Sequence, residues 1–425
     1  MYITRIETNI RTPGGVTYDD LSPKVFITGP NGAGKTSIMN AIELALTGEA
    51  HDLGGRDKAK TAAVLEGLIP DGEDRAYAYI SLSNGTTAHW EMERGKRPSR
   101  ATHGSVVKTY FLQPEVQAAL TGSKATTLRF LGRYFLSADW RQIGQEPNLG
   151  TWSTVATDLP LNERLLTVEE AARKSASSHA SEARALAAAL DQLGGTDVPE
   201  KTIMASAIVT LVKFQLKHSL TSCGVCGSDV TLKQLTERGH KAQELVGEAT
   251  FSGHIAALQN AHALAVHRTT EAKKVAAHCL EMLEVLINSR QKFITTEINR
   301  HRAAKIPPIS FKMEKSRIVF GFDSKEFHPM VSGAEYILLS TALGAAAAGQ
   351  LPFSALKVIT TPDKALDFES LTALLKALKG VPDTVGSFIV QSPIQPRGRP
   401  STVWTRIKLS PSKPQVDGPL AALPW

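Results

Sequence analysis

One glycine-rich loop constrains this chain more than any other stretch. Residues Gly29–Thr36 read G-P-N-G-A-G-K-T, which fits the phosphate-binding pattern G-x-x-x-x-G-K-[ST]. The residues before it, Lys24–Ile27, read as a buried strand, and Ser37–Leu44 after it read as a helix. This setting matters, because phosphate-binding loops join a strand to a helix. A nucleotide-binding α/β domain is therefore predicted around this loop.

The residue types of the loop indicate its chemistry. Glycines let backbone N–H groups turn onto phosphate oxygens, and the start of the following helix adds the positive end of its dipole. Lys35 is expected on the β- and γ-phosphates and the Thr36 hydroxyl on Mg²⁺. The predicted cofactors are therefore ATP and Mg²⁺, and the predicted ligands in this stretch are Asn31, Gly32, Ala33, Gly34, Lys35, Thr36 and Ser37.

Composition narrows the classes of protein that fit. At 425 residues the chain is long enough for two or three domain-sized units. The formal net charge of +7 fits a nucleic-acid partner without requiring one, because charge is informative only where it clusters. No run of about eighteen apolar residues and no signal-peptide core is present, so no membrane segment is expected. Because only three cysteines are present, no disulfide framework is expected, and the protein is predicted to be cytoplasmic.

The chain divides into three stretches by pattern. Residues 1–160 alternate strand-like and turn-like pieces and carry an Asn-Gly hairpin signal at Ser83–Thr86. Residues 161–303 nearly lack proline and are rich in strong helix formers. Residues 304–425 return to a β pattern around an Ala-rich helix. The predicted fold class is α/β: the lobes 1–160 and 304–425 form one nucleotide-binding head around a helical insertion.

Residues 258–293 carry the most regular periodicity of the chain. Apolar or small residues recur there at alternating spacings of three and four, as in the heptad seam of a coiled coil. Alanines of the first helical run recur at similar spacings, and the length of the two runs and the C-x-x-C between them favour an antiparallel hairpin. The alternative is an ordinary amphipathic helix in a helical domain. The seam consists of Leu258, Ala261, Ala265, Arg268, Ala272, Val275, Cys279, Met282, Leu286, Ser289 and Phe293.

Two cysteines, Cys223 and Cys226, lie between the helical runs in the sequence C-G-V-C-G. A C-x-x-C turn presents two thiolates that Zn²⁺ accepts, although two ligands make only half of a tetrahedral site. A redox-active dithiol is the alternative. Cys279 lies on the seam and is expected in the helix core, and His218 is expected to be solvated rather than a ligand.

The order of these motifs resembles the ABC-type ATPase heads of the SMC family, and most closely the zinc-hook (SbcC-like) repair ATPases. Such heads carry a phosphate loop, a Gln loop, a coiled coil out and back, a signature motif, a Walker B strand, a D-loop and a switch residue. The resemblance covers essentially the whole chain. It implies an ABC-type P-loop NTPase head with an inserted antiparallel coiled-coil hairpin that ends in a zinc hook at 223–226. It also implies nucleotide contacts by Arg11, Gln113, Ser332, Gly333 and Asp367, with Gln113 also on Mg²⁺ and with Cys223 and Cys226 on Zn²⁺.

The same resemblance implies a mechanism. Two heads would sandwich two nucleotides, with the Gly29–Thr36 loop of one head facing Ser332 of the other, and a second hook would complete a Cys₄ zinc site. The expected partners are a second copy of the chain, DNA and a separate nuclease, because the sequence shows no nuclease-like cluster of Asp, Glu and His. The expected function is nucleotide-controlled DNA binding or tethering in double-strand-break repair or recombination. The alternative is a non-hydrolysing, ATP-bound scaffold or clamp, for example in an anti-phage defence complex.

The chain departs from the family pattern at its catalytic positions. The family's Walker B strand ends in Asp-Glu before a proline, and Lys357–Pro362 fits that frame with Thr360 and Thr361 in their place. A threonine hydroxyl is no base at neutral pH, and Asp363 stands too far along the chain to replace one simply. Gln391 takes the place of the switch histidine. With Gln113, Thr361 and Gln391 at these positions, we expect ATP binding with very weak hydrolysis; the alternative is that the strand is misplaced.

Two basic stretches are candidates for DNA phosphate contacts. One is the loop Arg94–Arg100, and the other contains Arg397, Arg399, Arg406 and Lys408. Contacts to phosphates give strong salt dependence but no sequence reading. The alternative for both stretches is a solvated loop.

Overall fold

The computed structural model describes residues 1–50, 65–104, 108–136, 149, 152–194, 211–212, 234, 237, 251–304, 306–322, 325–326, 333–361, 366–394 and 403–410. The chain divides into two compact units. The first unit combines Met1–Leu136 with Ile287–Trp425, and the second is Ser137–Leu286. The sequence had placed the insertion at 161–303, whereas the second unit spans 137–286, so both of its boundaries lie earlier in the chain.

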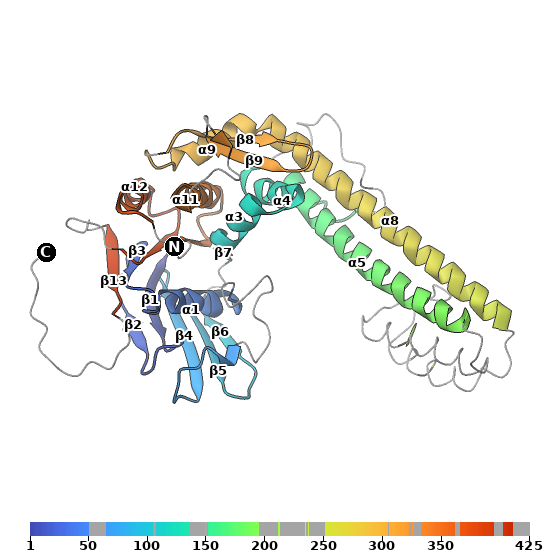
Figure 1. The fold of residues 1–425 in the computed structure, drawn as a ribbon, viewed down its shortest axis with the longest axis horizontal. Helices are drawn as coiled ribbons and strands as arrows, with labels where there is room; N and C mark the ends of the chain where they lie inside the picture. The colour runs from blue at the N-terminus through green and yellow to red at the C-terminus, as the bar shows by residue number, and fades with distance from the viewer. Residues whose placement is uncertain are drawn as a thin grey trace, which may run out of the picture. The chain divides into compact units, whose positions relative to one another are not determined.

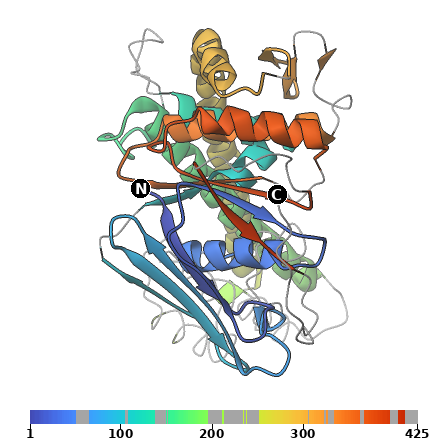
Figure 2. The same ribbon diagram turned by 90° about the vertical axis from the view of Figure 1, so that its left-hand side faces the viewer.

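A parallel sheet of five strands forms the centre of the first unit (Figures 1 and 2). Three of its strands, β3, β11 and β12, are buried along their whole length, which explains their nearly continuous apolar sequences. All neighbouring strands run parallel. The strand order is β13 (Trp404–Lys408), β3 (Lys24–Thr28), β12 (Ser387–Ser392), β11 (Leu356–Thr360) and β7 (Thr109–Phe111).

A second, antiparallel sheet belongs to the same unit. The hairpin expected at Ser83–Thr86 joins β4 to β5, and Ser81 pairs with Thr87 across it. Helix α1 (Lys35–Thr47) contacts this sheet, and one apolar core joins α1 to both sheets. The strand order is β2 (Val16–Tyr18), β1 (Ile3–Thr8), β4 (Arg75–Leu82), β5 (Thr87–Glu93) and β6 (Ser99–His103).

Helices cover the other face of the parallel sheet. The Ala-rich helix α11 (Gly333–Gly349) contacts β11 and the neighbouring helices α3 (Leu112–Thr121) and α12 (Phe368–Lys379). Its middle is buried on all sides because small alanines permit close packing. The remaining elements of this layer are α4 (Lys124–Phe135), α9 (Gln291–Arg300), β8 (Ile309–Met313), β9 (Ile318–Phe322) and β10 (Lys325–Glu326).

Helix α9 explains the difference in the boundary near residue 303. It contacts α11 and β8, and Ile294 and Ile298 on it are fully buried. The sequence assigned these residues to the helical insertion because helical periodicity continues through them. Their apolar side chains, however, pack into the core of the first unit. The strands expected at 309–313 and 317–322 form the antiparallel pair β8–β9 beside α9.

The second unit contains two long helices, α5 (Leu161–Gly194) and α8 (Phe251–Ser289), which lie side by side (Figure 1). Leu186 of α5 and Ala261 of α8 belong to one apolar cluster, while Glu169 lies close enough to Cys279 to act on its thiol. Residues early in α5 therefore face residues late in α8, as in an antiparallel pair. The expected seam holds at Leu258, Ala261, Ala265, Ala272, Cys279 and Leu286, all of which are buried.

Three residues of the expected seam, Arg268, Ser289 and Phe293, are exposed, and Val275 and Met282 are half-buried. Arg268 is exposed and the neighbouring Thr269 is buried, where its hydroxyl donates to the carbonyl of Ala265 at 2.8 Å. Burying the charged Arg268 would be costly. Thr269 can be buried in its place because its hydroxyl is hydrogen-bonded within the helix. Phe293 is exposed because α8 ends at Ser289 and α9 starts a new phase, which buries Ile294 instead.

Within the described parts of both units, no helix is long and apolar enough to span a membrane.

Candidate nucleotide-binding site

Four candidate site segments meet at one edge of the parallel sheet. Carboxyl ends of parallel strands lie at the same edge, and ligands of open α/β sheets bind there. The loop Gly29–Thr36 follows β3, and Thr28 at its start pairs with Ser392 of β12. Thr360 ends β11 opposite Ile389, two residues before Gln391. Gln113 follows β7, which pairs with β11. The sheet therefore brings together sites that lie hundreds of residues apart in sequence.

Strand alternation fixes which face of the sheet each side chain occupies. Val358 of β11 and Ile389 of β12 belong to the core that contains α1. Side chains two residues apart in a strand point to the same face, so Thr360 and Gln391 lie on the α1 face. This is the face from which the phosphate loop leads into α1. Thr360 and Gln391 therefore lie on the same face of the sheet as the helix that follows the phosphate loop.

The loop itself has the backbone of a phosphate cradle. Gly32 and Gly34 have φ angles of 81° and 94°, a region that side-chain-bearing residues rarely adopt. Gly34 is the N-cap of α1, and the first turn of α1 contains no acidic residue that would oppose an anion. The loop therefore fits a polyphosphate through backbone N–H groups at a helix start.

Lys35 lies inside this loop. Its side chain is buried and its Nζ donates to the carbonyl oxygens of Gly29 at 3.0 Å and Pro30 at 3.1 Å. The ammonium is therefore held over the loop, where phosphate oxygens would meet it. The next residue, Thr36, occupies the first turn of α1, and Ser37 is buried. The nucleotide and magnesium roles expected for Lys35 and Thr36 stay predictions.

Gly29 is required by a close contact rather than by its φ angle. A Cβ on Gly29 would stand 2.8 Å from the backbone oxygen of Leu409 and 2.9 Å from its Cβ. Leu409 is fixed there because its N–H donates to the carbonyl of Thr28 at 2.7 Å. The C-terminal strand β13 therefore packs directly against the start of the phosphate loop, a contact that the sequence motif alone did not predict.

Arg11 lies in a turn beside the loop. Its φ angle is 51°, its backbone N–H donates to Leu68 O, and its Nε donates to Gly67 O at 3.2 Å. The neighbouring Thr12 hydroxyl would lie 4.0 Å from a Cβ on Gly34. The turn is thus adjacent to the loop, and the guanidinium is exposed and held by a backbone carbonyl.

Two buried amides near the loop have no hydrogen-bond partner. Both side-chain amide atoms of Gln113, at the start of α3, are unpaired although the residue is 7% exposed. The same holds for both amide atoms of Asn40, which is 1% exposed. Unpaired buried polar atoms are costly and are a mark of ligand sites. Asn40 was not among the predicted site residues. Its position four residues after Thr36 places both on one face of α1, and this spacing could have indicated Asn40 from the sequence.

Thr361 and Gln391 form a reciprocal pair at the ends of β11 and β12. The Gln391 N–H donates to Thr361 Oγ1 at 3.1 Å, and Gln391 Nε2 donates to Thr361 O at 3.0 Å. Both residues are buried, and Gln391 Oε1 has no partner. The pair consists of neutral groups that extend the sheet. None of these groups can accept a proton from water at neutral pH.

The residues fit a nucleotide better than they fit the usual magnesium site. Proteins hold Mg²⁺ with one or two carboxylates together with substrate phosphates. The candidate groups here are the Thr36 hydroxyl and the Gln113 amide oxygen, and threonines stand at the end of β11. Within the described residues, no group of three or more His, Cys, Asp or Glu side chains is arranged to hold a metal ion.

Several predicted site residues lie at the edges of the described chain. Gly333 begins α11, but Ser332 lies outside the described residues, as do Asp363, Cys223 and Cys226. Asp367 is the N-cap of α12 and accepts bonds from Ser370 N at 2.8 Å and Ser370 Oγ at 2.6 Å. Its carboxylate therefore caps a helix within the chain.

Some residues of the two basic stretches make contacts within the chain. Arg100 donates to the carbonyls of Ala45 at 3.0 Å and Leu46 at 2.6 Å, and so binds the C-terminal end of α1. Lys96 pairs with Glu93. In β13, the Arg406 guanidinium lies 5.9 Å from the ring centroid of Phe26. Arg397 and Arg399 lie outside the described residues.

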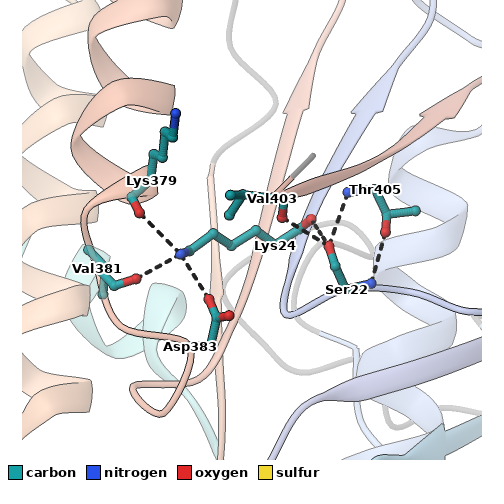
Figure 3. Close-up of polar contacts among 7 residues, drawn as sticks. All are labelled: Ser22, Lys24, Lys379, Val381, Asp383, Val403 and Thr405. Carbon is teal, nitrogen blue, oxygen red and sulfur yellow. Dashed lines mark hydrogen bonds and ion pairs between the residues drawn. The ribbon is translucent and has the colours of Figure 1, made fainter. Parts of the chain in front are cut away.

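Lys24 anchors the N-terminal end of β3, which is the end opposite the phosphate loop (Figure 3). Its buried Nζ donates to Val381 O at 2.7 Å and Lys379 O at 3.4 Å, and pairs with Asp383 at 2.9 Å. These carbonyls lie at the last residue of α12 and two residues beyond it, so the lysine binds the negative end of that helix to the strand that carries the loop. Beside it, Ser22 Oγ accepts from Thr405 N at 3.0 Å and joins β3 to β13.

Comparison with known families identifies one part of the chain. Residues 9–133 match an AAA domain. This range contains the phosphate loop, α1 and Gln113, and it supports an ATP-binding domain at the site described above. No curated protein matches the chain in sequence.

Solved structures show distant overall likenesses. The recombination mediator protein RecF bound to ATP, from the RecFOR pathway, is similar over 94% of this chain and 93% of its own, with 10% sequence identity and a TM-score of 0.41. The Smc head domain with a coiled coil and joint from Pyrococcus yayanosii is similar over 92% of both chains, with 13% identity and a TM-score of 0.41. Likenesses at this level do not decide the function, which is inferred from the residues of the site.

Proposed function

We propose that this chain is an ATP-binding head of the SMC type that holds ATP and hydrolyses it very slowly. The single observation that carries this proposal is the pairing of an intact phosphate cradle with a neutral Thr361–Gln391 pair at the neighbouring strand ends. The cradle supports binding. The neutral pair supports slow turnover, because loss of general-base help costs about 10²–10⁴-fold in rate.

The proposed roles of the residues follow from their positions. Backbone N–H groups of Asn31–Ser37 would bind the phosphates, and Lys35 would release its loop carbonyls to neutralise the β- and γ-phosphates. Gln113 would satisfy its unpaired amide on the γ-phosphate side. Mg²⁺, when bound, would supply further neutralisation of phosphate charge through Thr36 and Gln113.

The active form is proposed to be a dimer of heads. The loop of one head would face Ser332 and Gly333 of a second copy, whose helix α11 begins at that point. ATP would then join the heads, and Arg11 and Asp367 would contribute near the nucleotide. DNA would bind across the closed heads or between the arms, and any cutting would require a partner nuclease. We propose a cytoplasmic role in double-strand-break repair or recombination.

The helices α5 and α8 are proposed to form an antiparallel coiled-coil arm. Cys223 and Cys226 at its tip would bind Zn²⁺ together with the same pair of a second arm. We expect about one zinc per two chains. Metal analysis of purified protein, and of the variant in which both cysteines are serine, would test this. Zinc-free protein that still dimerises through its arm tips would refute the hook.

A binding and turnover experiment tests the proposed function. Purified protein is incubated with ATP, and bound nucleotide and released phosphate are measured with and without DNA. We expect stoichiometric retention of ATP with turnover near background. Rapid turnover that is abolished by changing Asp363 alone would show that the threonines do not occupy the catalytic position.

A hydrolysing subunit that drives a partner nuclease is the second candidate. The buried, unpaired amide of Gln113 favours it, because a ligand-sensing residue is retained at the site. The two candidates differ in one readout. A hydrolysing head should show DNA-stimulated phosphate release, whereas a clamp should stay dimeric on ATP and separate only when the nucleotide is removed.

A further inference from the structure

We infer that this head binds ATP with little dependence on Mg²⁺, so that its ligand is the free triphosphate anion as well as the magnesium complex. The inference rests on the proposed nucleotide site and concerns which ionic form of the nucleotide that site accepts. It follows from the charge of the side chains at the strand ends and from the hydrogen-bonding capacity they leave open.

Among the described residues, the ends of β11 and β12 carry no charged side chain that a metal would have to offset. Thr360 and Gln391 lie on the α1 face of the sheet, beside the phosphate loop, and Thr361 continues β11 by one residue. In a site with carboxylates at these positions, the carboxylates repel the phosphates until a cation lies between them. Neutral side chains remove that repulsion, so ATP loses less affinity when Mg²⁺ is absent.

The positive contributions to the site do not depend on metal. Lys35 is buried, with its ammonium on the loop carbonyls of Gly29 and Pro30. The N-terminus of α1 adds its dipole without an acidic residue in the first turn. Because Lys35 is only 3% exposed, its charge is less screened by solvent than that of a surface lysine.

The buried amides also suit an anion. Gln113 has an unpaired amide nitrogen as well as an unpaired oxygen. An amide N–H can donate to a phosphate oxygen, which a carboxylate at the same place cannot do. Satisfying that buried donor adds to the affinity for metal-free nucleotide, since an unpaired buried donor carries a desolvation cost.

The Thr361–Gln391 pair limits how far the site can adapt to a cation. Thr361 Oγ1 already accepts the Gln391 N–H at 3.1 Å, and Gln391 Nε2 is held by Thr361 O at 3.0 Å. Turning either side chain toward a metal would break a buried hydrogen bond. The unpaired atom of this pair is Gln391 Oε1, a neutral oxygen, so the pair offers Mg²⁺ no carboxylate ligand.

The test measures ATP affinity of the full chain by titration calorimetry, once with Mg²⁺ and once with excess EDTA. We expect the two dissociation constants to agree within about tenfold. A loss of more than tenfold in EDTA would overturn the inference while leaving the proposed nucleotide site intact. Absence of ATP binding under both conditions would instead refute the nucleotide site itself.

Two substitutions locate the cause. Thr360→Asp should weaken binding in EDTA at least tenfold relative to binding in Mg²⁺, because the new carboxylate repels metal-free phosphate. Asparagine has nearly the shape of aspartate without its charge. Thr360→Asn should therefore keep the wild-type ratio of the dissociation constant in EDTA to the dissociation constant in Mg²⁺, even if both constants change. If Thr360→Asp fails to fold, as judged by thermal unfolding, Gln391→Glu places the negative charge on β12 instead. It should likewise raise the dissociation constant in EDTA relative to the dissociation constant in Mg²⁺. An unchanged ratio in the folded acidic variant would contradict the inference.

Discussion

Thr361 and Gln391 hold each other at the ends of two neighbouring parallel strands. The backbone N–H of Gln391 donates to Thr361 Oγ1 at 3.1 Å, and Gln391 Nε2 donates to the carbonyl of Thr361 at 3.0 Å. In the proposed nucleotide site, the ends of β11 and β12 thus supply two neutral side chains that bind each other. Retention of nucleotide, rather than its turnover, follows from that chemistry.

Removal of the Thr361 hydroxyl should reduce stability. Thr361→Val keeps the shape of the side chain but leaves the buried Gln391 N–H without its acceptor, which should cost about 1–3 kcal/mol. Thr361→Ser retains the acceptor and should cost less. Urea denaturation of the two variants measures the difference, and equal losses would show that the hydroxyl does not hold β12.

A side chain at Gly29 should disturb the loop through β13. In Gly29→Ala the new methyl would stand 2.8 Å from Leu409 O, so the backbone of one strand must move, at a cost of about 1–3 kcal/mol. ATP affinity should fall with it. Gly349→Ala, at the end of α11 with nothing within 4 Å, is the matched control and should change stability by less than about 0.5 kcal/mol. Thermal unfolding and ATP titration of both variants test the contact.

Lys24 should be more important for stability than its ion-pair partner. Lys24→Met leaves the carbonyls of Lys379 and Val381 without the ammonium and should cost about 2–4 kcal/mol. Asp383→Asn removes only the pair with an exposed carboxylate and should cost less than about 1 kcal/mol. If the two variants lose the same free energy of unfolding in a denaturation experiment, the stabilisation by Lys24 comes from its ion pair with Asp383 and not from its hydrogen bonds to the end of α12.

Cys279 should be the unreactive thiol of the chain. Burial, and after it the charge of Glu169, raises the pKa of its thiol to about 12. Because the folded pKa lies above the unfolded one, the thiol's contribution to stability is complete below about pH 9 and is lost as the pH rises toward 12. Wild type should therefore lose stability relative to Cys279→Ala between pH 9 and 10.5. In zinc-free native protein, iodoacetamide should react with Cys223 and Cys226 well before Cys279.

The sequence was informative where one local pattern decides one local structure. Gly29–Thr36 indicated its strand, loop and helix because the glycines and Lys35 have no other common use in that order, and Asn84–Gly85 indicated its hairpin. The seam was predicted except at Arg268 and around the end of α8 at Ser289, because periodicity alone does not show which side of a helix meets another layer.

The contacts that position the site could not be predicted in the same way. The approach of Leu409 to Gly29, the binding of Arg100 to the end of α1 and the Thr361–Gln391 pair each join segments far apart in sequence. Their existence depends on the order and register of the parallel strands, which no local pattern encodes. The unpaired amide of Asn40 is visible only once its surroundings are known.

Steady-state ATP hydrolysis by the full chain, measured together with the nucleotide that remains bound, tests the central claim most directly. The account predicts that ATP stays bound and unhydrolysed over many minutes, with turnover at least about 10²-fold below that of a head with an intact catalytic base. Turnover at ordinary ATPase rates, about 1 s⁻¹ or faster, would contradict it, because no neutral Thr361–Gln391 pair could sustain that rate.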